Sequence, residues 1–265
     1  MTPIIDSHVH VYPDKIAQKA VEGIGRFYDI PMGLDGTLAT LQSAGARAGI
    51  THYVVFSVAT KPSQTSSINR FIAQTVAESG GTMTGLGTLH PDSPDLAADL
   101  EELMSLGLKG VKLHPDIQGF KLDDYRCLEI YRRCEGRLPV LLHTGDKRYD
   151  LSNPNRLCPI LDIYKNLTVI GAHFGGWSIW EEAAPLLKQY PNFYVDTSSS
   201  LYAISPRAGQ DLVRQYGAHR VLFATDYPMW DPSQELERFR ALELSEREQE
   251  QILWENAARL FDITL

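Results

Sequence analysis

Eight short apolar runs rich in β-forming residues recur along the chain of 265 residues, and this repetition is the feature that most limits its fold. The runs cover residues 4–8, 53–58, 85–89, 111–114, 140–143, 167–172, 193–197 and 221–225. After the first gap, their starts lie roughly 25 to 32 residues apart, the length of one strand, one helix and two loops. The spacing therefore predicts a repeated βα unit.

The segments between these runs have helical periodicity, because their apolar residues recur every three or four positions. Two such sets are Leu96, Leu100, Leu103 and Leu106, and Leu122, Tyr125, Leu128 and Tyr131. A last helix is expected to begin at Ser245, since Glu248 three residues later completes a capping box. The first gap, residues 11–50, is longer, and residues 26–32 within it are expected to form a lid.

Eight covered parallel strands can form an open sheet or a closed barrel, and the positions of polar residues favour the barrel. The first strand is followed by neither a GxGxxG nor a GxxxxGK[ST] motif, which the open nucleotide-binding sheets use. Polar residues instead follow nearly every run, and in a barrel those carboxyl ends meet at one mouth. The sequence thus predicts a single (β/α)8 TIM-barrel domain over residues 1–265.

Composition argues against several functional classes. The formal charge of −8 gives no general attraction to nucleic acid or to an anionic membrane, so we expect neither as a partner. The three cysteines form no CxxC pair, which favours reduced thiols in the cytoplasm over disulfides or a thiolate zinc site. The N-terminal residues contain neither a basic region nor a long apolar stretch, and no run of about 18 apolar residues occurs. A cytoplasmic protein is expected.

His8 and His10 form the sharpest local motif. Residues two apart on a strand project to the same face, so both imidazoles are predicted to point into the barrel mouth. His143 ends the fifth run and Asp226 follows the eighth, which adjoins the first in a closed barrel. Imidazole and carboxylate ligands suit zinc, iron or manganese. We therefore predict one divalent metal held by His8, His10, His143 and Asp226.

An isolated HxH pair is commonly structural, and it is the joint placement of these residues at strand ends that favours a metal site. His173 follows the sixth run, beside His143, and is predicted to stay free of the metal and to assist catalysis with Asp226. Asp6 and Asp196 are interpreted as partners of the ligands. His52 and His219 precede their strands and are interpreted as structural residues.

Lys112 and His114 share a face at the end of the fourth run. Three explanations remain for the lysine: a contact to substrate, a carbamylated bridge between two metals, or a buried ion pair at the barrel floor. We favour substrate binding for Lys112 and His114.

Six motifs together resemble the amidohydrolase superfamily, in its amidohydrolase-related branch of compact barrels that includes aminocarboxymuconate semialdehyde decarboxylase. They are Asp-Ser-His-Val-His, Gly-Val-Lys-Leu-His-Pro, Leu-Leu-His-Thr-Gly, Gly-Ala-His-Phe-Gly-Gly, Phe-Ala-Thr-Asp-Tyr-Pro and Glu-Asn-Ala-Ala-Arg-Leu-Phe. The resemblance spans nearly the whole chain. The chain lacks the flanking β-sandwich segments that many longer members carry. It implies a distorted barrel with one divalent metal, Zn²⁺ or alternatively Mn²⁺, on the same four residues.

The predicted function is a metal-dependent hydrolase that cleaves an amide, ester or lactone of a small, carboxylate-bearing substrate with metal-activated water. The alternative is nonoxidative decarboxylation of an unsaturated or aromatic acid on the same metal. The decarboxylation hypothesis needs cations that hold a carboxylate and aromatic side chains that flank a ring. The candidate cations are Lys61, Arg70, Lys147, Arg148 and Arg207, and the candidate aromatic residues are Phe174, Trp177 and Trp230. A third hypothesis is a barrel that binds a metal or small ligand without turnover, or a metal-free site like that of a lactonase. The resemblance also implies a possible homodimer.

Overall fold

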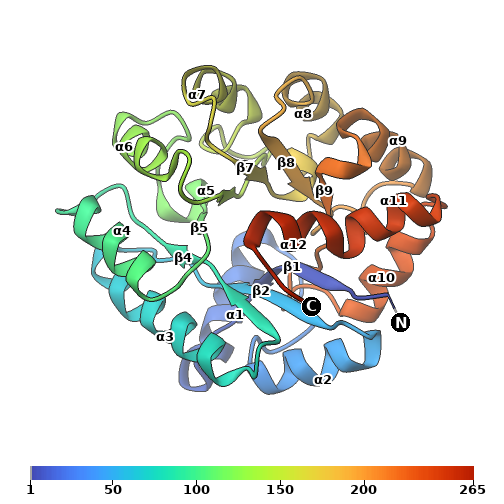
Figure 1. The fold of residues 1–265 in the computed structure, drawn as a ribbon, viewed down its shortest axis with the longest axis horizontal. Coiled ribbons are helices and arrows are strands. Elements are labelled where there is room, and N and C mark those ends of the chain that lie inside the picture. Colours follow the sequence, from blue (N-terminus) through green and yellow to red (C-terminus); the bar gives the residue numbers. More distant parts are fainter. Residues whose placement is uncertain (1) are drawn as a thin grey trace.

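In the computed structural model, which describes residues 2–265, the predicted barrel is present as a ring of parallel strands surrounded by helices (Figure 1). The strands are β1 (Ile5–His10), β2 (His52–Phe56), β3 (Met83–Gly85), β4 (Gly87–Thr88), β5 (Val111–Leu113), β6 (Val140–Leu142), β7 (Val169–Gly171), β8 (Phe193–Asp196) and β9 (Val221–Leu222). Each of the eight predicted runs overlaps a strand. The third run is divided at Leu86 into β3 and β4.

The ring is closed at both places where the ladder of strand pairs is interrupted. Parallel pairing runs in the order β1-β2-β3 and β4-β5-β6-β7-β8-β9. Beside Leu86, Lys109 N donates to Gly85 O and Gly87 N donates to Gly110 O, which carries the pairing across the division. At the other seam, Ser7 N donates to Phe223 O and His10 N to Tyr227 O. The last strand therefore lies beside the first, as the metal site requires.

Helices follow the strands and cover the outside of the barrel. The longer ones are α1 (Asp14–Tyr28), α2 (Leu38–Ala48), α3 (Thr65–Glu78), α4 (Leu96–Ser105), α6 (Tyr125–Cys134), α7 (Leu157–Ile163), α8 (Trp180–Leu187), α9 (Pro206–Tyr216) and α10 (Pro232–Arg240). Short helical turns occur at α5 (Pro115–Gln118), η1 (Pro62–Gln64), η2 (Pro154–Arg156), η3 (His173–Gly175) and η4 (Ala218–Arg220). The first gap thus holds two helices, α1 and α2, and a connection between them.

The C-terminal helix closes the end of the barrel opposite the predicted mouth. It comprises α11 (Glu246–Glu250), a π-helical turn η5 (Gln251–Glu255) and α12 (Asn256–Phe261), and it begins with the predicted capping box of Ser245 and Glu248. Ala257 and Phe261 pack against the apolar residues inside the barrel, and Asn256 donates to the Val221 carbonyl at the start of β9. In Figure 1 this helix, in red, crosses the front of the strands.

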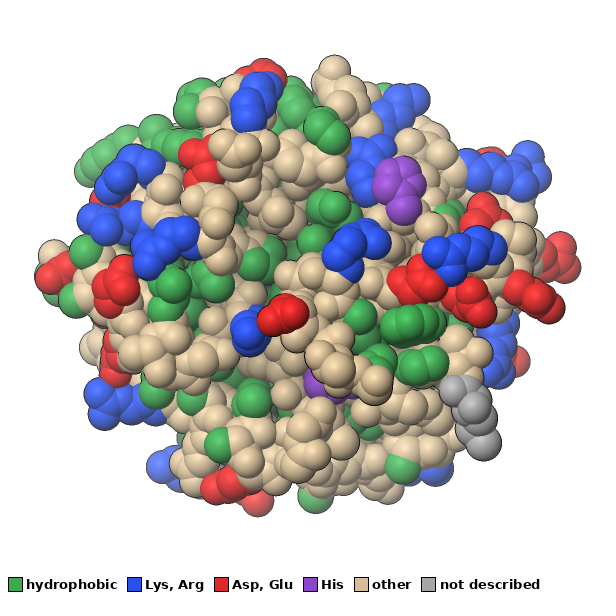
Figure 2. Space-filling model, viewed as in Figure 1, with side chains coloured by type: hydrophobic (Ala, Val, Ile, Leu, Met, Phe, Trp, Pro, Cys, Tyr) green, Lys and Arg blue, Asp and Glu red, His purple; other side chains and the backbone are tan. Residues whose placement is uncertain are grey.

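Most of the apolar core lies between the barrel and its helices, and a smaller cluster fills the barrel interior. Cys127 and Cys134 are buried and all three cysteines are free thiols. Around the face covered by the C-terminal helix, basic and acidic side chains lie interspersed (Figure 2). Within residues 2–265, none of the helices has the length and apolar character needed to cross a membrane.

Candidate metal centre

A cavity of about 30 Å³ lies at the carboxyl ends of the strands, and most of the residues singled out from the sequence line it. These are His8 and His10 of β1, Lys112 of β5, His114 just after β5, His143 just after β6, His173 just after β7, and Asp226 after β9. The cavity is large enough for water, which needs roughly 10–15 Å³ by a comparable measure. Polar side chains from five strand ends therefore converge on one small space.

His8, His10 and Asp226 bring three donor atoms together. His8 Nε2 lies 3.2 Å from His10 Nε2 and 3.3 Å from Asp226 Oδ1, and His10 Nε2 lies 3.5 Å from that oxygen. Donors bound about 2.0–2.1 Å from one tetrahedral ion are about 3.4 Å apart, so the spacing suits a single cation. Two neutral nitrogens and a carboxylate oxygen are also the chemistry that zinc or manganese accepts.

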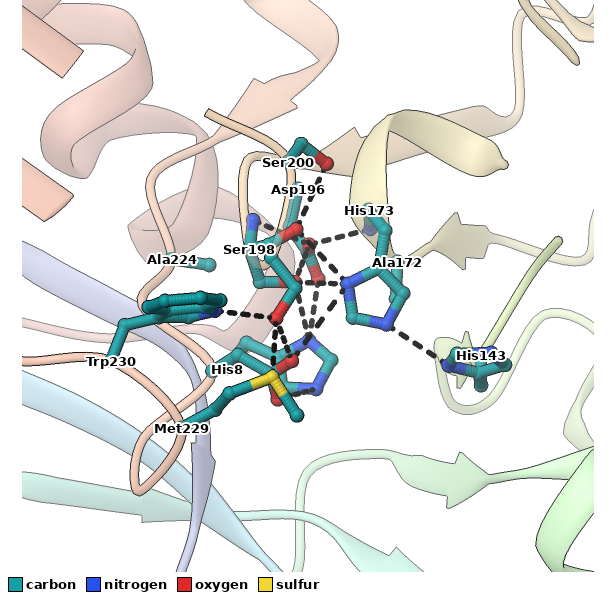
Figure 3. Close-up of polar contacts among 12 residues, drawn as sticks. His8, His143, Ala172, His173, Asp196, Ser198, Ser200, Ala224, Met229 and Trp230 are labelled. Atoms are coloured by element: carbon teal, nitrogen blue, oxygen red, sulfur yellow. Dashed lines mark hydrogen bonds and ion pairs between the residues drawn. The ribbon is translucent and has the colours of Figure 1, made fainter. Parts of the chain in front are cut away.

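The orientation of His8 is fixed by a carboxylate behind it (Figure 3). His8 Nδ1 lies 2.8 Å from Asp196 Oδ2, so the ring donates there and leaves Nε2 facing the cavity. Asp196 is itself held because its Oδ1 accepts hydrogen bonds from the backbone N–H groups of His173 and Ser198. A carboxylate that orients a histidine in this way is a common partner of metal ligands.

Asp226 is held in a conformation that few residues adopt. Its φ of 61° lies in the left-handed region, where a non-glycine residue is strained, and such strain concentrates at functional sites. Its backbone N–H donates to His8 O across the barrel seam, and Ser199 Oγ donates to its Oδ2 at 2.5 Å. These bonds leave Oδ1 directed at the two histidines.

His143 stands slightly apart from this triad. It forms a second group with His114 and Asp116, and its ring stacks on that of His114 with the centroids 3.9 Å apart. His143 Nδ1 lies 3.0 Å from His173 Nε2, and its Nε2 lies 3.5 Å from Asp116 Oδ2 without a hydrogen-bond partner. The structure thus places His143 on the same cavity, with His173 beside it, but not within the closely spaced triad.

Burial sets the charge of these groups. It lowers the pKa of the His8, His10, His114 and His143 imidazoles, so the rings are neutral at neutral pH, as metal ligands must be. It also lowers the pKa of His173 to about 4 and that of Lys112 to about 8. Lys112 Nζ lies 3.3 Å from His8 Nε2. The cavity wall therefore carries one amine that is readily protonated near neutral pH.

The last turn of α1 roofs the cavity. Tyr28 Oη lies 2.7 Å from His114 Nε2, and the Tyr28 ring packs edge-on against Trp177. Arg148 fixes this turn, because it donates to Phe27 O and lies 5.2–5.5 Å from the ring centroids of Phe27, Tyr28, Tyr149 and Trp177. Residues 26–28 of the predicted lid are thus the end of a helix that packs over the cavity, and residues 29–32 follow that helix.

Three of the cations proposed to hold a substrate carboxylate are paired with acidic side chains instead. Arg148 makes a two-pronged contact with Asp146, Arg70 pairs with Glu102, and Arg207 pairs with Asp211. Of the proposed ring-flanking aromatics, Phe174 is fully buried and Trp230 donates to Ser199 Oγ; neither lines the cavity. Lys112 is the cationic residue that does.

The amidohydrolase family model matches residues 5–263, nearly the whole chain. The chain belongs to the amidohydrolase family. No curated protein sequence matches it significantly.

Solved structures share the fold of this amidohydrolase. An uncharacterised TIM-barrel protein from Bordetella bronchiseptica has 23% identity and a TM-score of 0.82, with 98% of each chain covered. A dihydroxybenzoic acid decarboxylase from Polaromonas, solved with manganese and the inhibitor 2-nitroresorcinol, has 18% identity and a TM-score of 0.74, with 99% of this chain and 97% of that one covered. An amidohydrolase from Burkholderia multivorans with bound zinc has 15% identity and a TM-score of 0.78, with 99% and 100% covered.

Three residues of the amidohydrolase site were not identified from the sequence. Asp116 follows His114-Pro115, and the proline, which favours the first position of a helix, is the sequence signal that could have indicated the short helix α5 on which Asp116 lies. Ser199 lies in a loop whose shape no local pattern indicates. Tyr28 reaches the site only because α1 packs across the barrel end, and its place in the predicted lid was the one hint.

Proposed function

We propose that this amidohydrolase is a metal-dependent hydrolase that cleaves an amide, ester or lactone bond in a small substrate bearing a carboxylate. The observation that carries the proposal is the convergence of His8 Nε2, His10 Nε2 and Asp226 Oδ1, all 3.2–3.5 Å apart, on a water-sized cavity. The family match supports the same class of chemistry.

His8, His10 and Asp226 would hold the divalent cation, and His143, which lines the same cavity, would complete the set. Zn²⁺ is the proposed ion and Mn²⁺ the alternative. When bound, such an ion supplies Lewis acidity, which lowers the pKa of water from about 15.7 toward 7.

Asp226 transfers the proton in the proposed reaction. Its Oδ2 accepts a hydrogen bond from Ser199, which keeps the carboxylate pointed at the cavity. There it takes a proton from the attacking water and returns it to the leaving group. His173 is neutral at neutral pH, because burial lowers its pKa to about 4. It orients neighbouring groups through its contacts with Ser198 and His143.

Lys112 is the proposed anchor for the substrate's negative charge. It is fully buried, its ammonium group faces the cavity beside His8, and no carboxylate contacts it among residues 2–265. An anionic group of the substrate would hold the lysine in its charged form. His114 forms the adjacent wall, where its ring is fixed by Tyr28 and by stacking on His143.

Decarboxylation is the second candidate. Lys112 favours this reaction too, because a lysine beside the metal donors can hold a carboxylate that is about to leave as carbon dioxide. A decarboxylase of hydroxybenzoic acids shares the fold. Asp226 would then relay a proton from water to the carbon that loses carbon dioxide, instead of to a leaving oxygen or nitrogen.

The deciding experiment is a substrate panel on metal-loaded protein. Lactones, esters and amides of small carboxylic acids are assayed for hydrolysis, and hydroxybenzoates and muconate-like acids for carbon dioxide release. We expect hydrolysis that is lost with a chelator and restored by Zn²⁺ or Mn²⁺, and that the His143→Asn variant lacks. Carbon dioxide release without hydrolysis would assign the second reaction. Turnover that persists after complete metal removal would overturn both.

A further inference from the structure

A second, much larger hollow opens beside the metal cavity. It has a volume of about 950 Å³ and runs between α1 and α3, which lie near each other at the lower left of Figure 1. His10, His114, Ile24 and Ile117 line both spaces. The groove therefore adjoins the candidate metal centre, and the side chains of two isoleucines and two site histidines form the wall that the two spaces share.

The groove has apolar walls and a basic rim. Ile16, Ile24 and Phe27 of α1 face Ile68 and Phe71 of α3 across it, and Ile16 is 45% exposed although it is a large apolar side chain. Lys15 and Lys19, one helical turn apart, also line it, and neither forms an ion pair within residues 2–265. The acidic residue of the lining, Asp116, accepts a hydrogen bond from Ser152.

A glycine in the middle of α1 keeps this space open. Gly23 lines the groove, and a Cβ at its position would meet no atom within 4 Å. Glycine inside a helix costs about 1 kcal/mol relative to alanine, and here no close packing requires it. The absence of a side chain at Gly23 leaves open space along this face of α1.

We propose that this groove binds the apolar body of the substrate, with a second anionic group of the substrate at Lys15 and Lys19. This inference rests on the proposed function and names its substrate class: acids with an alkyl or aryl body that carry a second carboxylate at the far end. The volume falls within the roughly 300–1,000 Å³ of small-molecule sites that bury most of their ligand. The reacting bond lies at the inner end, beside His10 and His114.

Direct binding tests this proposal independently of turnover. Butanedioate, octanedioate and octanoate are titrated into metal-loaded protein by calorimetry. Each methylene buried contributes up to about a fourfold gain in affinity, so octanedioate should bind at least tenfold more tightly than butanedioate. Replacement of Lys15 and Lys19 by Gln should weaken octanedioate several-fold and leave octanoate unchanged.

Filling the groove is the sharper test, because Gly23 can be replaced without touching neighbouring atoms. Gly23→Leu should weaken octanedioate at least tenfold and leave butanedioate unchanged, while urea unfolding shows a stability equal to or above that of the wild type. Gly23→Ala is the matched control, since a methyl group occupies little of the groove, and it should bind both acids as the wild type does.

Three results would overturn the inference. They are no dependence of affinity on chain length, octanedioate binding in Gly23→Leu equal to wild type, and self-association of the wild type that Gly23→Leu abolishes, which would assign the groove to a second copy of the chain. Tight octanedioate binding with no turnover of any substrate would leave the groove assigned and would overturn the proposed function alone.

Discussion

At the scale of single residues, the candidate site depends on side chains that aim other side chains. His8 presents Nε2 to the cavity because Asp196 holds Nδ1 at 2.8 Å, and Asp226 presents Oδ1 because Ser199 and the backbone of β1 hold the rest of the residue. Ligand geometry of this kind is set before a cation arrives, which reduces the entropy lost on binding.

Asp196→Asn should therefore weaken metal binding without unfolding the protein. The amide keeps the shape but loses the negative charge that makes the His8 ring a better ligand, and such changes cost roughly 10–100-fold in metal affinity. Competition titrations with a zinc indicator measure the loss. Asp162→Asn, at an exposed position, is the control. Equal affinities for the two variants would contradict the role given to Asp196.

The triad could be anticipated from sequence because two rules suffice for it. Alternation along a strand puts His8 and His10 on one face, and closure of the barrel puts Asp226 beside them. The same rules do not reach Asp116, Tyr28 or Ser199, since these lie on a helical turn, a helix end and a loop whose courses depend on tertiary packing. They also did not reveal that His143 lies nearer His114 and Asp116 than the triad.

At the scale of elements, α1 is the part of the barrel that decides access. Its last turn roofs the metal cavity and its outer face lines the larger groove. The turn is attached chiefly through Arg148, whose guanidinium joins Asp146, the Phe27 carbonyl and four aromatic rings.

Arg148→Met should loosen this end of α1 and leave the barrel intact. The side chain is about one-third exposed, so we expect a loss of about 1–2 kcal/mol in local stability, equivalent to roughly tenfold faster amide hydrogen exchange over residues 24–28. Mass spectrometry of the exchanged protein measures it. Arg132→Met, which breaks an exposed helix pair with Glu129, serves for comparison. An unchanged rate of amide hydrogen exchange at the end of α1 would show that Arg148 does not hold this turn in place.

The elements themselves were largely predictable, because eight apolar runs at a regular interval leave few alternatives. Two details were not. The third strand is divided at Leu86, and the final helix contains a π-helical turn over Gln251–Glu255. Both are local adjustments of one residue. The hydrophobic periodicity of a sequence is judged over several turns, so it does not reveal a change of one residue.

At the scale of the whole molecule, buried charges couple the fold to pH. Glu235, at the start of α10, is fully buried, and burial raises its pKa from 4.5 to about 7 despite its ion pair with Arg238. Between these two values the folded state binds more protons than the unfolded state. The contribution of this group to stability is therefore complete below about pH 4.5 and is lost as the pH rises through 7.

Glu235→Gln should remove that dependence. At pH 8 the variant should be more stable than the wild type, by up to about 3 kcal/mol on the basis of the pKa shift, and at pH 5 the difference should shrink toward zero. Urea unfolding of both proteins at the two pH values isolates the effect, because the buried histidines titrate alike in each. A variant less stable than the wild type at pH 8 would show that the ion pair outweighs the burial of the charge.

Metal binding should also register in the stability of the entire barrel, because the ligands come from strands distant in sequence. An ion at 100 times its Kd stabilises the folded state by about 2.7 kcal/mol, and for a chain near this length that raises Tm by about 5–10 °C. Scanning calorimetry of chelator-treated protein, with and without added Zn²⁺, measures the shift. His143→Asn should reduce it by at least half if His143 completes the ligand set, whereas His219→Asn, far from the cavity, should leave it unchanged. A full shift in His143→Asn would mean that His8, His10 and Asp226 hold the ion without His143, and that His143 acts with His114 and Asp116 instead.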